Sequence, residues 1–290
     1  MKKTLTLPEK AGQMLIAGFE GTKINSQIED LILKHHVGGF ILFERNYENP
    51  EQLFHLIQDM QKLAFSKPSR LPLFISVDQE GGRVARLSAP FSSFPFPCCL
   101  GAAKSEDLAF KFGQAMGQEL AAVGINIDYA PVLDVNTNPH NPIIGNRAFS
   151  DDPKWAARLG ADFIRGCREA GVLPVGKHFP GHGDTRVDSH LELPYVDRDA
   201  KTLEKVELHP FAQAIKNGVD ILMTAHVVYR AWDDQFPATF SAKILQDILR
   251  KKLGYRGLII SDDLEMKAVE NHFSFESFPQ LGVSAGIDLF

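Results

Sequence analysis

Eight short apolar runs constrain the fold of this chain more than any other feature of its sequence. A polar loop and an amphipathic helical pattern follow most of them. The runs lie at residues 13–19, 38–43, 71–77, 125–129, 172–175, 220–224, 257–260 and 287–290. Continuous apolar runs are typical of parallel strands that are covered on both faces. Because these strands alternate with helices, the sequence predicts right-handed βαβ units and an α/β fold.

The segments between the runs carry helix signals. Residues that cap helices, or prolines suited to a first turn, precede apolar stripes at helical spacing. These starts are Asn49-Pro50, Ser105, Asp152-Pro153 and Ser241. A further helix is expected over residues 203–217, and Pro210 should kink it or start a second turn there.

Eight such units favour a (β/α)8 barrel of the TIM type over an open doubly wound sheet. The chain has 290 residues, and barrels of about 250 residues form one domain. No linker-like change of composition divides the chain, so we expect a single domain over residues 1–290. The sequence stops at Phe290, inside the eighth run and before any closing helix. The last βα unit of the barrel is therefore expected to be truncated.

Charge and cysteine content narrow the classes of function. A net charge of -5 and an isoelectric point near 6.1 provide no basic surface for nucleic acid or an anionic membrane. The cysteines, two of them adjacent at Cys98 and Cys99, form no disulfide framework and no CxxC metal pair, which suits a reducing compartment. The first residues are too polar for a signal-peptide core, and no apolar run approaches a membrane span. We therefore expect a cytoplasmic protein without a nucleic-acid or membrane partner.

Polar clusters follow the apolar runs, at the points where the predicted strands end. They are Glu44-Arg45-Asn46, Asp78-Gln79-Glu80, Asp134, Lys177-His178, His226 and Asp262-Asp263. In a barrel, the carboxyl ends of the strands meet on one face, where functional residues gather. The sequence therefore predicts one site built from these clusters.

The densest cluster is the stretch KHFPGHGDTRVDSHLELP, residues 177–194, which holds one lysine, three histidines and three acids. Asp188 lies two residues before His190. A carboxylate so placed can bond one imidazole nitrogen and leave the other for general acid/base catalysis. The alternative is a hydrogen bond that only braces the loop. The glycines of the loop predict that residues 181–190 are mobile and close over a ligand.

The strand-end acids allow two interpretations each. Asp262, in GLIISDDLEM, would project from the end of its strand into the site. Alternatively, Ser261 or Asp262 caps a following helix. Asp78 with Arg83 or Arg86 could bind substrate hydroxyl groups, or could form a structural ion pair.

Three other polar residues stay open in the same way. Arg147, on a Pro/Asn-rich loop after the fourth run, could be a second polar clamp. Asp134 could orient its neighbours or occupy a plain turn. His226, at the end of the sixth run, is in such a place more often a satisfied polar group than a catalyst.

Taken in order, six stretches of the chain resemble glycoside hydrolase family 3. They are DQEGGRVARL, APVLDV, NPIIGNRAF, KHFPGHGDTRVDSHLELP, MTAH and GLIISDDLEM. Within that family they are most similar to the bacterial β-N-acetylglucosaminidases of the NagZ type, which recycle cell-wall muropeptides. The resemblance covers the chain from about residue 7 to residue 290.

The resemblance implies a retaining hydrolase on a (β/α)8 barrel that uses no cofactor and no metal. Asp262 matches the nucleophile that forms a covalent glycosyl-enzyme, and His190 matches the acid/base that pairs with Asp188. The residues that match those holding the N-acetylglucosamine ring are Asp78, Arg86, Arg147, Lys177 and His178. A histidine in place of the usual second carboxylate avoids like-charge repulsion with the nucleophile. The implied substrate is a small carbohydrate of the GlcNAc-anhydro-muropeptide type.

Two alternatives belong to other classes of protein. A metal-dependent barrel hydrolase could use Lys177, His178, His226 and Asp262 as a ligand set, although the chain has no HExxH motif and no HxH on an early strand. A non-catalytic sugar-binding protein could also retain a truncated barrel.

Overall fold

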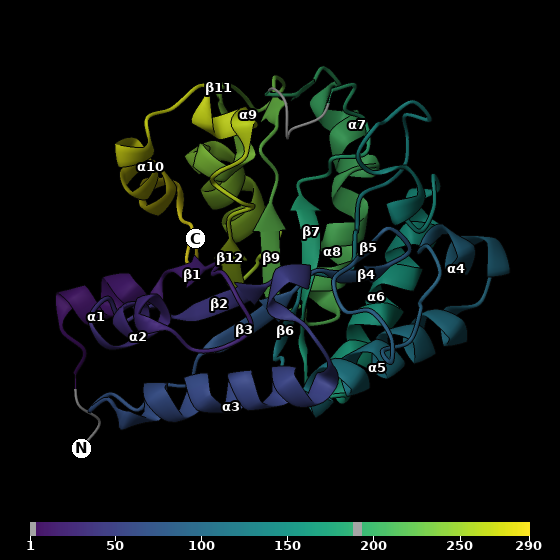
Figure 1. Cartoon of the computed structure of the whole chain (residues 1–290). Helices are drawn as coiled ribbons and strands as arrows, with labels where there is room; N and C mark the ends of the chain where they lie inside the picture. The colour runs from purple at the N-terminus through teal and green to yellow at the C-terminus, as the bar shows by residue number, and fades with distance from the viewer. Residues whose placement is uncertain (1–3, 188–192) are drawn as a thin grey trace.

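A sheet of seven parallel strands forms the centre of the molecule (Figure 1). The computed structural model describes residues 4–187 and 193–290. In their order across the sheet, the strands are β1 (Ile16–Ala17), β2 (Gly39–Leu42), β3 (Phe74–Val77), β6 (Ile127–Asp128), β7 (Leu173–Phe179), β9 (Ile221–Thr224) and β12 (Leu258–Ile260). Each of them lies within or overlaps one of the predicted apolar runs. The predicted α/β fold with a parallel sheet is confirmed.

The last residues of the chain join the two edges of this sheet. The N–H of Ile16 donates to the carbonyl of Phe290, and the N–H of Phe290 donates to the carbonyl of Met14, both at 2.8 Å. Leu289 forms a parallel bridge with Ile260 of β12. The eighth apolar run therefore lies between β12 and β1, an arrangement consistent with the predicted barrel.

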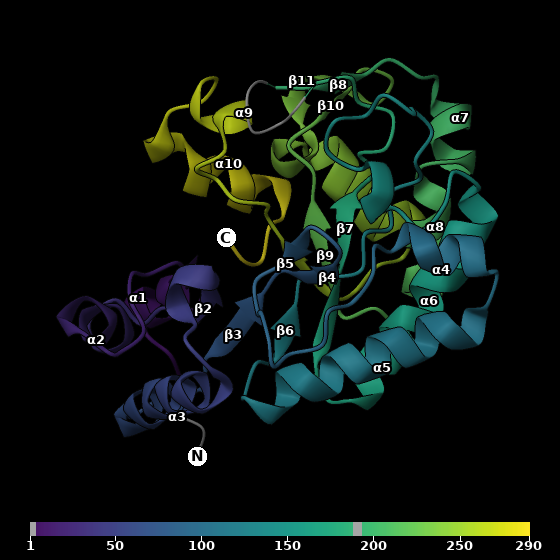
Figure 2. The same ribbon diagram turned by 45° about the vertical axis from the view of Figure 1, so that its right-hand side comes forward.

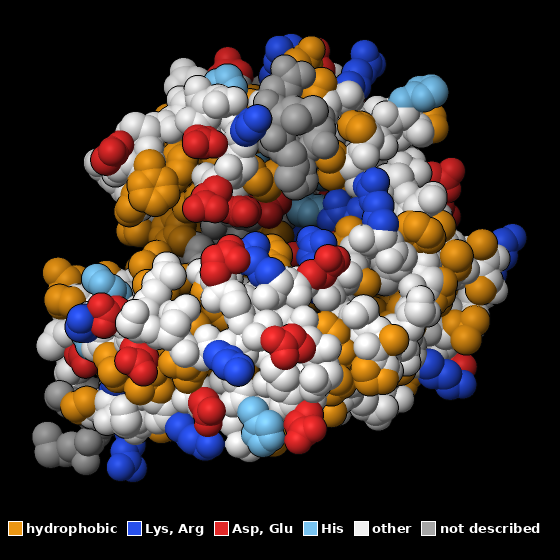
Figure 3. Space-filling model, viewed as in Figure 1, with side chains coloured by type: hydrophobic (Ala, Val, Ile, Leu, Met, Phe, Trp, Pro, Cys, Tyr) orange, Lys and Arg blue, Asp and Glu red, His pale blue; other side chains and the backbone are white. Residues whose placement is uncertain are grey.

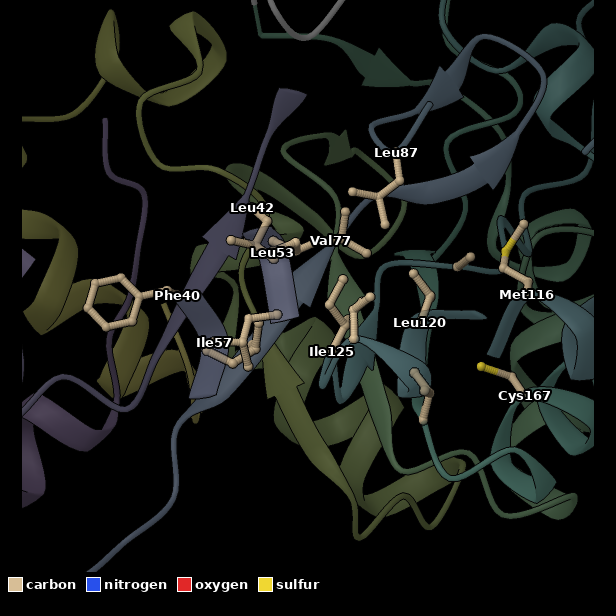
Figure 4. Close-up of a cluster of buried hydrophobic side chains, with 14 of the residues drawn as sticks. Phe40, Leu42, Leu53, Ile57, Val77, Leu87, Met116, Leu120, Ile125 and Cys167 are labelled. Carbon is tan, nitrogen blue, oxygen red and sulfur yellow. The ribbon is translucent and has the colours of Figure 1, made fainter. Parts of the chain in front are cut away.

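Two apolar layers explain why the strand sequences are hydrophobic without interruption. Ile41 of β2 packs with an inner cluster that draws residues from all seven strands and Leu289. Its neighbours Phe40 and Leu42 belong to an outer cluster, shared with helices on the far side of the strands (Figure 4). Successive side chains of a strand point to opposite faces. Both faces are thus covered, as expected for parallel strands.

Helices surround the sheet on its outer side (Figures 1 and 2). They are α1 (Leu7–Gln13), α2 (Ser26–Leu33), α3 (Pro50–Ser66), α4 (Cys98–Ala103), α5 (Glu106–Ala122), α6 (Pro153–Glu169), α7 (Ala200–Lys205), α8 (Leu208–Lys216), the π-helix η4 (Lys243–Lys252), α9 (Lys267–Glu270) and α10 (Phe278–Ala285). Single 3-10 turns are η1 (Glu44–Asn46), η2 (Gly145–Arg147), η3 (Ala238–Phe240) and η5 (Phe275–Ser277). Among the described residues, no helix combines the length and apolar character needed to cross a membrane.

Three of the helix starts read from the sequence are confirmed by their caps. Asn49, Ser105 and Asp152 each accept a backbone hydrogen bond from the first turn of α3, α5 and α6. The segment that contains Pro210 is divided into α7 and α8, as its position predicts. Local capping chemistry was therefore sufficient to locate these boundaries.

Two small sheets extend the loops at the carboxyl ends of the strands. The hairpin of β4 (Gln79–Gly81) and β5 (Val84–Ala85) follows β3 directly. A second sheet combines β8 (Tyr195–Val196), β10 (Val228–Tyr229) and β11 (Asp233–Pro237). It lies beyond the ends of β7 and β9 (Figure 2). Neither sheet was predicted, because four of these strands have only two or three residues and the five residues of β11, DDQFP, form no apolar alternation.

Candidate active site

Four charged side chains form a cluster at the carboxyl ends of β3 and β7. Lys177 Nζ lies 2.7 Å from Glu80 Oε1, and Arg147 bonds both carboxylate oxygens of Glu80 at 2.7 and 2.8 Å. Lys177 Nζ also lies 2.7 Å from Asp78 Oδ1. Burial alone would raise the pKa of Glu80, but Lys177 and Arg147 outweigh it and hold that pKa well below its usual range. Glu80 is therefore ionised at neutral pH.

The acid at its centre, Glu80, belongs to one of the predicted strand-end clusters, but the sequence assigned it no role of its own. It lies two positions after Asp78 in a stretch that the structure shows as extended. Residues two apart on a strand share a face, so the spacing in DQE could have identified it. Arg147, predicted as a substrate clamp, is buried, and it directs its Nε and Nη2 to this acid.

Asp78 and Arg86 are more exposed than the buried members of the cluster. They are 18% and 31% exposed, against 2% for Lys177. Arg86 Nη2 lies 4.0 Å from Asp78 Oδ2, and among the described residues its Nε has no hydrogen-bond partner. The side-chain oxygen of Gln79 accepts hydrogen bonds from the N–H groups of Arg86 and Leu87. These two hydrogen bonds hold the β4–β5 hairpin in place. Figure 3 shows acidic, basic and histidine side chains gathered around a hollow on one face of the molecule.

Asp134 orients His178 and does not serve as a plain turn residue. Its Oδ2 lies 2.7 Å from His178 Nδ1, and its Oδ1 accepts the N–H groups of His178 and His182 at 3.1 and 2.7 Å. Burial tends to raise the pKa of Asp134, but the two histidines lower it below its ordinary value. With Nδ1 held by an anionic oxygen, the Nε2 edge of His178 is turned away from Asp134.

Asp262 follows β12 and remains half-buried. Its Oδ1 accepts the N–H of Asp263 at 2.9 Å. Burial favours a raised pKa, but the imidazoles of His178 and His226, the Asp263 N–H and the Lys177 ammonium together lower the pKa of Asp262. The carboxylate is therefore anionic at neutral pH.

The helix cap considered for Ser261 or Asp262 is not formed, because α9 begins after Met266 and has no side-chain cap. The neighbouring acid instead braces the turn that follows β12. Asp263 is exposed, and its Oδ1 accepts the N–H of Glu265 at 2.9 Å. The two adjacent acids therefore differ in environment, one in the site and one in a solvent-exposed turn.

Both ring nitrogens of His226 have hydrogen-bond partners. This agrees with the interpretation, favoured by its position, that it is a structural polar group and not a catalyst. It is buried, with Nδ1 2.8 Å from Thr239 Oγ1 and Nε2 2.9 Å from the Asp263 carbonyl. Within the described residues, no group of three or more His, Cys, Asp or Glu side chains is placed to hold a metal ion. The ligand set considered for a metal-dependent hydrolase is not assembled in that part of the chain.

The predicted dyad, Asp188 and His190, lies outside the described residues. The described half of its loop, residues 181–187, is anchored by hydrogen bonds from several elements. Asn141 Nδ2 donates to the carbonyls of His182 and Gly183 at 2.9 and 3.1 Å. Tyr229 Oη donates to the Gly181 carbonyl at 2.7 Å. Arg198 Nη2 contacts Asp184 Oδ1 at 2.6 Å.

The two glycines of this half-loop each have a local structural reason. A Cβ on Gly183 would lie 1.7 Å from the carbonyl oxygen of Val135, so a glycine is needed for close packing of two backbones. Gly181 has φ +133°, and a Cβ there would lie 2.8 Å from Glu207 Cβ. Close contact therefore accounts for both glycines, and the mobility of residues 181–190 stays a prediction.

A buried acid beneath the site braces the segment that carries Asp78 and Glu80. Asp128 Oδ1 accepts the N–H of Gln79 at 3.0 Å, while no described residue bonds its Oδ2. Burial raises the pKa of Asp128 well above its ordinary value. The folded protein therefore favours the neutral acid at this position.

We expect Asp128→Asn to change the pH dependence of stability in a defined direction. A raised pKa in the folded state means that stability is lost as the pH rises from the unfolded-state pKa towards the folded-state pKa. Asparagine cannot ionise, so its advantage over aspartate should be small near pH 4 and should grow towards pH 7.5. Urea unfolding at both values tests this, with Asp234→Asn, at an exposed position, as the matched control. An advantage that shrinks with rising pH would contradict a neutral Asp128.

The comparisons with known proteins agree with one another. The family described as "Glycosyl hydrolase family 3 N terminal domain" matches residues 6–290. "Beta-hexosaminidase A" of Pseudoalteromonas piscicida is 40% identical over 284 residues, which cover 92% of this chain and 48% of that protein. "Beta-hexosaminidase" of Alkalilimnicola ehrlichii is 40% identical over 281 residues, covering 95% of this chain and 79% of the relative.

Two solved structures are similar over nearly the whole chain. One is a glycoside hydrolase family 3 β-N-acetylglucosaminidase from Paenibacillus sp., with a TM-score of 0.96, 43% identity and coverage of 99% of this chain and 54% of that one. The other is NagZ from Neisseria gonorrhoeae in complex with N-trifluoroacetyl-D-glucosamine. Its TM-score is 0.87, its sequence identity is 35%, and the match covers 95% of this chain and 80% of the NagZ chain. This chain spans about half the length of the Pseudoalteromonas and Paenibacillus proteins.

Proposed function

Because this chain belongs to glycosyl hydrolase family 3, we propose that it is a retaining β-N-acetylglucosaminidase that removes terminal N-acetylglucosamine from cell-wall muropeptide fragments. The observation that supports this best is the anionic carboxylate of Asp262, close enough to His178 and Lys177 for both to lower its pKa. Relatives named beta-hexosaminidase, and a similar structure with a bound N-acylglucosamine analogue, support the choice of sugar.

The proposed reaction has two displacements at the anomeric carbon. Asp262 attacks that carbon while the bond to the leaving oxygen breaks, and His190 protonates that oxygen. The resulting glycosyl-enzyme is then opened by a water molecule, which His190 deprotonates. Asp188 orients the imidazole and stabilises its charged form. Two inversions return the original configuration and the free Asp262 carboxylate.

Binding of the sugar is assigned to the polar residues that the resemblance implied: Asp78, Arg86, Arg147, Lys177 and His178. Asp78 and Arg86 are the more exposed of the charged members, so we propose that they meet the ring hydroxyl groups directly. Lys177, held by Glu80 together with Arg147, would keep Asp78 in position through its contact with Asp78 Oδ1. We further propose that the strands form a (β/α)8 barrel of the TIM type. We also propose that the protein acts in the cytoplasm, as its free cysteines suggest.

Activity on an N-acetylglucosaminide should far exceed activity on a plain glucoside. A site built to hydrogen-bond one substituent leaves polar groups unpaired with an analogue that lacks it, and the rate ratio should be on the order of 10²-fold or more. Hydrolysis of the 4-nitrophenyl β-glycosides of both sugars measures this ratio. Equal rates would remove the case for N-acetyl specificity. Binding of N-acetylglucosamine without any hydrolysis would favour the non-catalytic sugar-binding alternative.

His190→Ala should damage substrates with poor leaving groups far more than activated aryl glycosides. A good leaving group departs without protonation, whereas a poor one loses general acid catalysis worth about 10²–10⁴-fold. Asp188→Ala should show the same pattern more weakly, because it removes only the group that orients the imidazole. If the hydrolysis rates of the two substrate types fall by the same factor, His190 is not the general acid. Asp184 and Glu192 from the same loop then become the candidates.

A further inference from the structure

His226 lies next to the segment that carries the proposed nucleophile, although it belongs to a different strand loop. It follows β9, and both of its ring nitrogens have partners. Nε2 lies 2.9 Å from the carbonyl oxygen of Asp263, and Nδ1 lies 2.8 Å from Thr239 Oγ1. The imidazole therefore connects η3 to the residue that directly follows Asp262.

The tautomer of His226 follows from its partners. A backbone carbonyl can only accept a hydrogen bond, so Nε2 must carry a proton and donate it to Asp263. In the neutral ring, Nδ1 can only accept, so the single hydroxyl proton of Thr239 is directed to Nδ1 at 2.8 Å and not to the Ala225 carbonyl at 3.2 Å. Burial lowers the pKa of His226 and favours this neutral form. Thr224 Oγ1 lies 2.9 Å from Thr239 Oγ1, so the hydroxyl is itself held in place.

The backbone of Asp263 is thus held on both sides of its Cα. Its N–H donates to Asp262 Oδ1 at 2.9 Å, and its carbonyl accepts from His226. If the carbonyl loses its partner, the Asp263 peptide groups can rotate, and the N–H that orients the Asp262 carboxylate moves with them. The Asp263 carbonyl also accepts from the N–H of Met266, but at 3.2 Å.

We propose that His226 is a positioning residue for the Asp262 carboxylate, acting through the backbone of Asp263. The proposal rests on the proposed function, in which Asp262 attacks the anomeric carbon. Nucleophilic attack depends on the alignment of the reacting atoms, and a misplacement of about 1 Å can cost on the order of 10²-fold in rate. A group that only aligns the nucleophile should affect kcat and leave KM nearly unchanged.

Two replacements of similar volume separate positioning from packing. A glutamine at this position can place an amide N–H near the site of Nε2, while a leucine fills the space without a donor. We therefore expect His226→Leu to lower kcat by about 10²-fold at nearly constant KM. His226→Gln should recover most of that loss and stay within about tenfold of the wild type. The rate of covalent trapping by a mechanism-based fluorosugar should fall in parallel with kcat.

Thr239→Val provides a test that does not depend on the stability of the leucine variant. It removes the hydroxyl that holds Nδ1 and leaves the imidazole in place, so kcat should fall by about three- to tenfold, again at constant KM. Circular dichroism and urea unfolding show whether each variant is folded. His226→Leu or Thr239→Val with wild-type kcat would overturn the proposal, as would a glutamine variant as slow as the leucine variant.

Failure of the proposed function gives a different result from failure of this inference. If the fluorosugar does not label Asp262 in the wild-type protein, the assignment of the nucleophile is wrong, whatever the His226 variants do. If Asp262 is labelled and the His226 variants are trapped at the wild-type rate, only the positioning role is lost.

Discussion

Replacement of Asp262 by asparagine is expected to abolish turnover while the fold and sugar binding stay intact. Asparagine has nearly the same shape, and its side-chain oxygen can still accept the N–H of Asp263. It has no anionic oxygen to form the covalent intermediate, so kcat should fall by on the order of 10³-fold or more. A 4-nitrophenyl N-acetyl-β-glucosaminide measures the loss, and binding of N-acetylglucosamine by calorimetry should persist.

The adjacent acid is the matched control for this experiment. Asp263 is exposed, and its side chain accepts only a local backbone hydrogen bond from Glu265 in the described contacts. Asp263→Asn preserves that acceptor and should retain most of the activity. A mechanism-based fluorosugar should label Asp262 in the wild-type protein. Labelling of Asp263, or equal damage from the two substitutions, would show that the wrong member of the pair was chosen.

Glu80→Gln should cost both stability and activity. Glu80 is buried and receives the guanidinium of Arg147 and the ammonium of Lys177. Glutamine would leave two buried cations facing the single carboxylate of Asp78. Removing one partner from a buried ionic group is destabilising by about 3–5 kcal/mol. Because Lys177 and Asp78 would also shift, the binding of the sugar should weaken.

The pH dependence of this loss distinguishes an ionic cause from a packing cause. The pKa of Glu80 in the folded protein lies below its usual value. Its stabilising contribution is therefore present above the unfolded-state pKa of about 4.3 and is lost as the pH falls below it. The difference in the free energy of unfolding between wild type and Glu80→Gln should narrow in acid. Glu276→Gln, at an exposed site, is the control, and a constant difference at all pH values would indicate packing alone.

The strand-end residues show how far sequence reasoning reached into the site. Asp78, Lys177, His178 and Asp262 each follow an apolar run, and the structure places all four at the carboxyl ends of β3, β7 and β12, which are alternate strands of the sheet. Their convergence follows from the geometry of a parallel sheet, in which all carboxyl ends lie at one edge. That argument needs only the position of each residue relative to its strand.

The roles of Glu80 and Asp134 were beyond that argument. Glu80 pairs with Arg147, 67 residues further along the chain, and Asp134 pairs with His178, 44 residues further on. An acid at a strand end can face solvent, cap a helix or neutralise a cation. The choice depends on which charge the fold brings within about 4 Å.

The half-loop at residues 181–187 shows that a glycine can have more than one structural use. Its glycines were taken as a sign of mobility, yet Gly183 is required by the carbonyl of Val135 and Gly181 by its positive φ. A missing Cβ permits both free movement and close backbone contact. The residue type alone does not distinguish these two uses.

By itself, the sequence determined the strands of the central parallel sheet, three of the helix starts and the edge of the sheet at which the polar residues gather. These depend on hydrophobic periodicity and capping, which act over a few residues. Only the tertiary structure decided which of the gathered charges pair, with Lys177 meeting an acid 99 positions away. It also decided that His226 contacts the Asp263 backbone. The strength of an ionic or hydrogen-bonded contact depends on distance and burial in space, and no local pattern of residues encodes either.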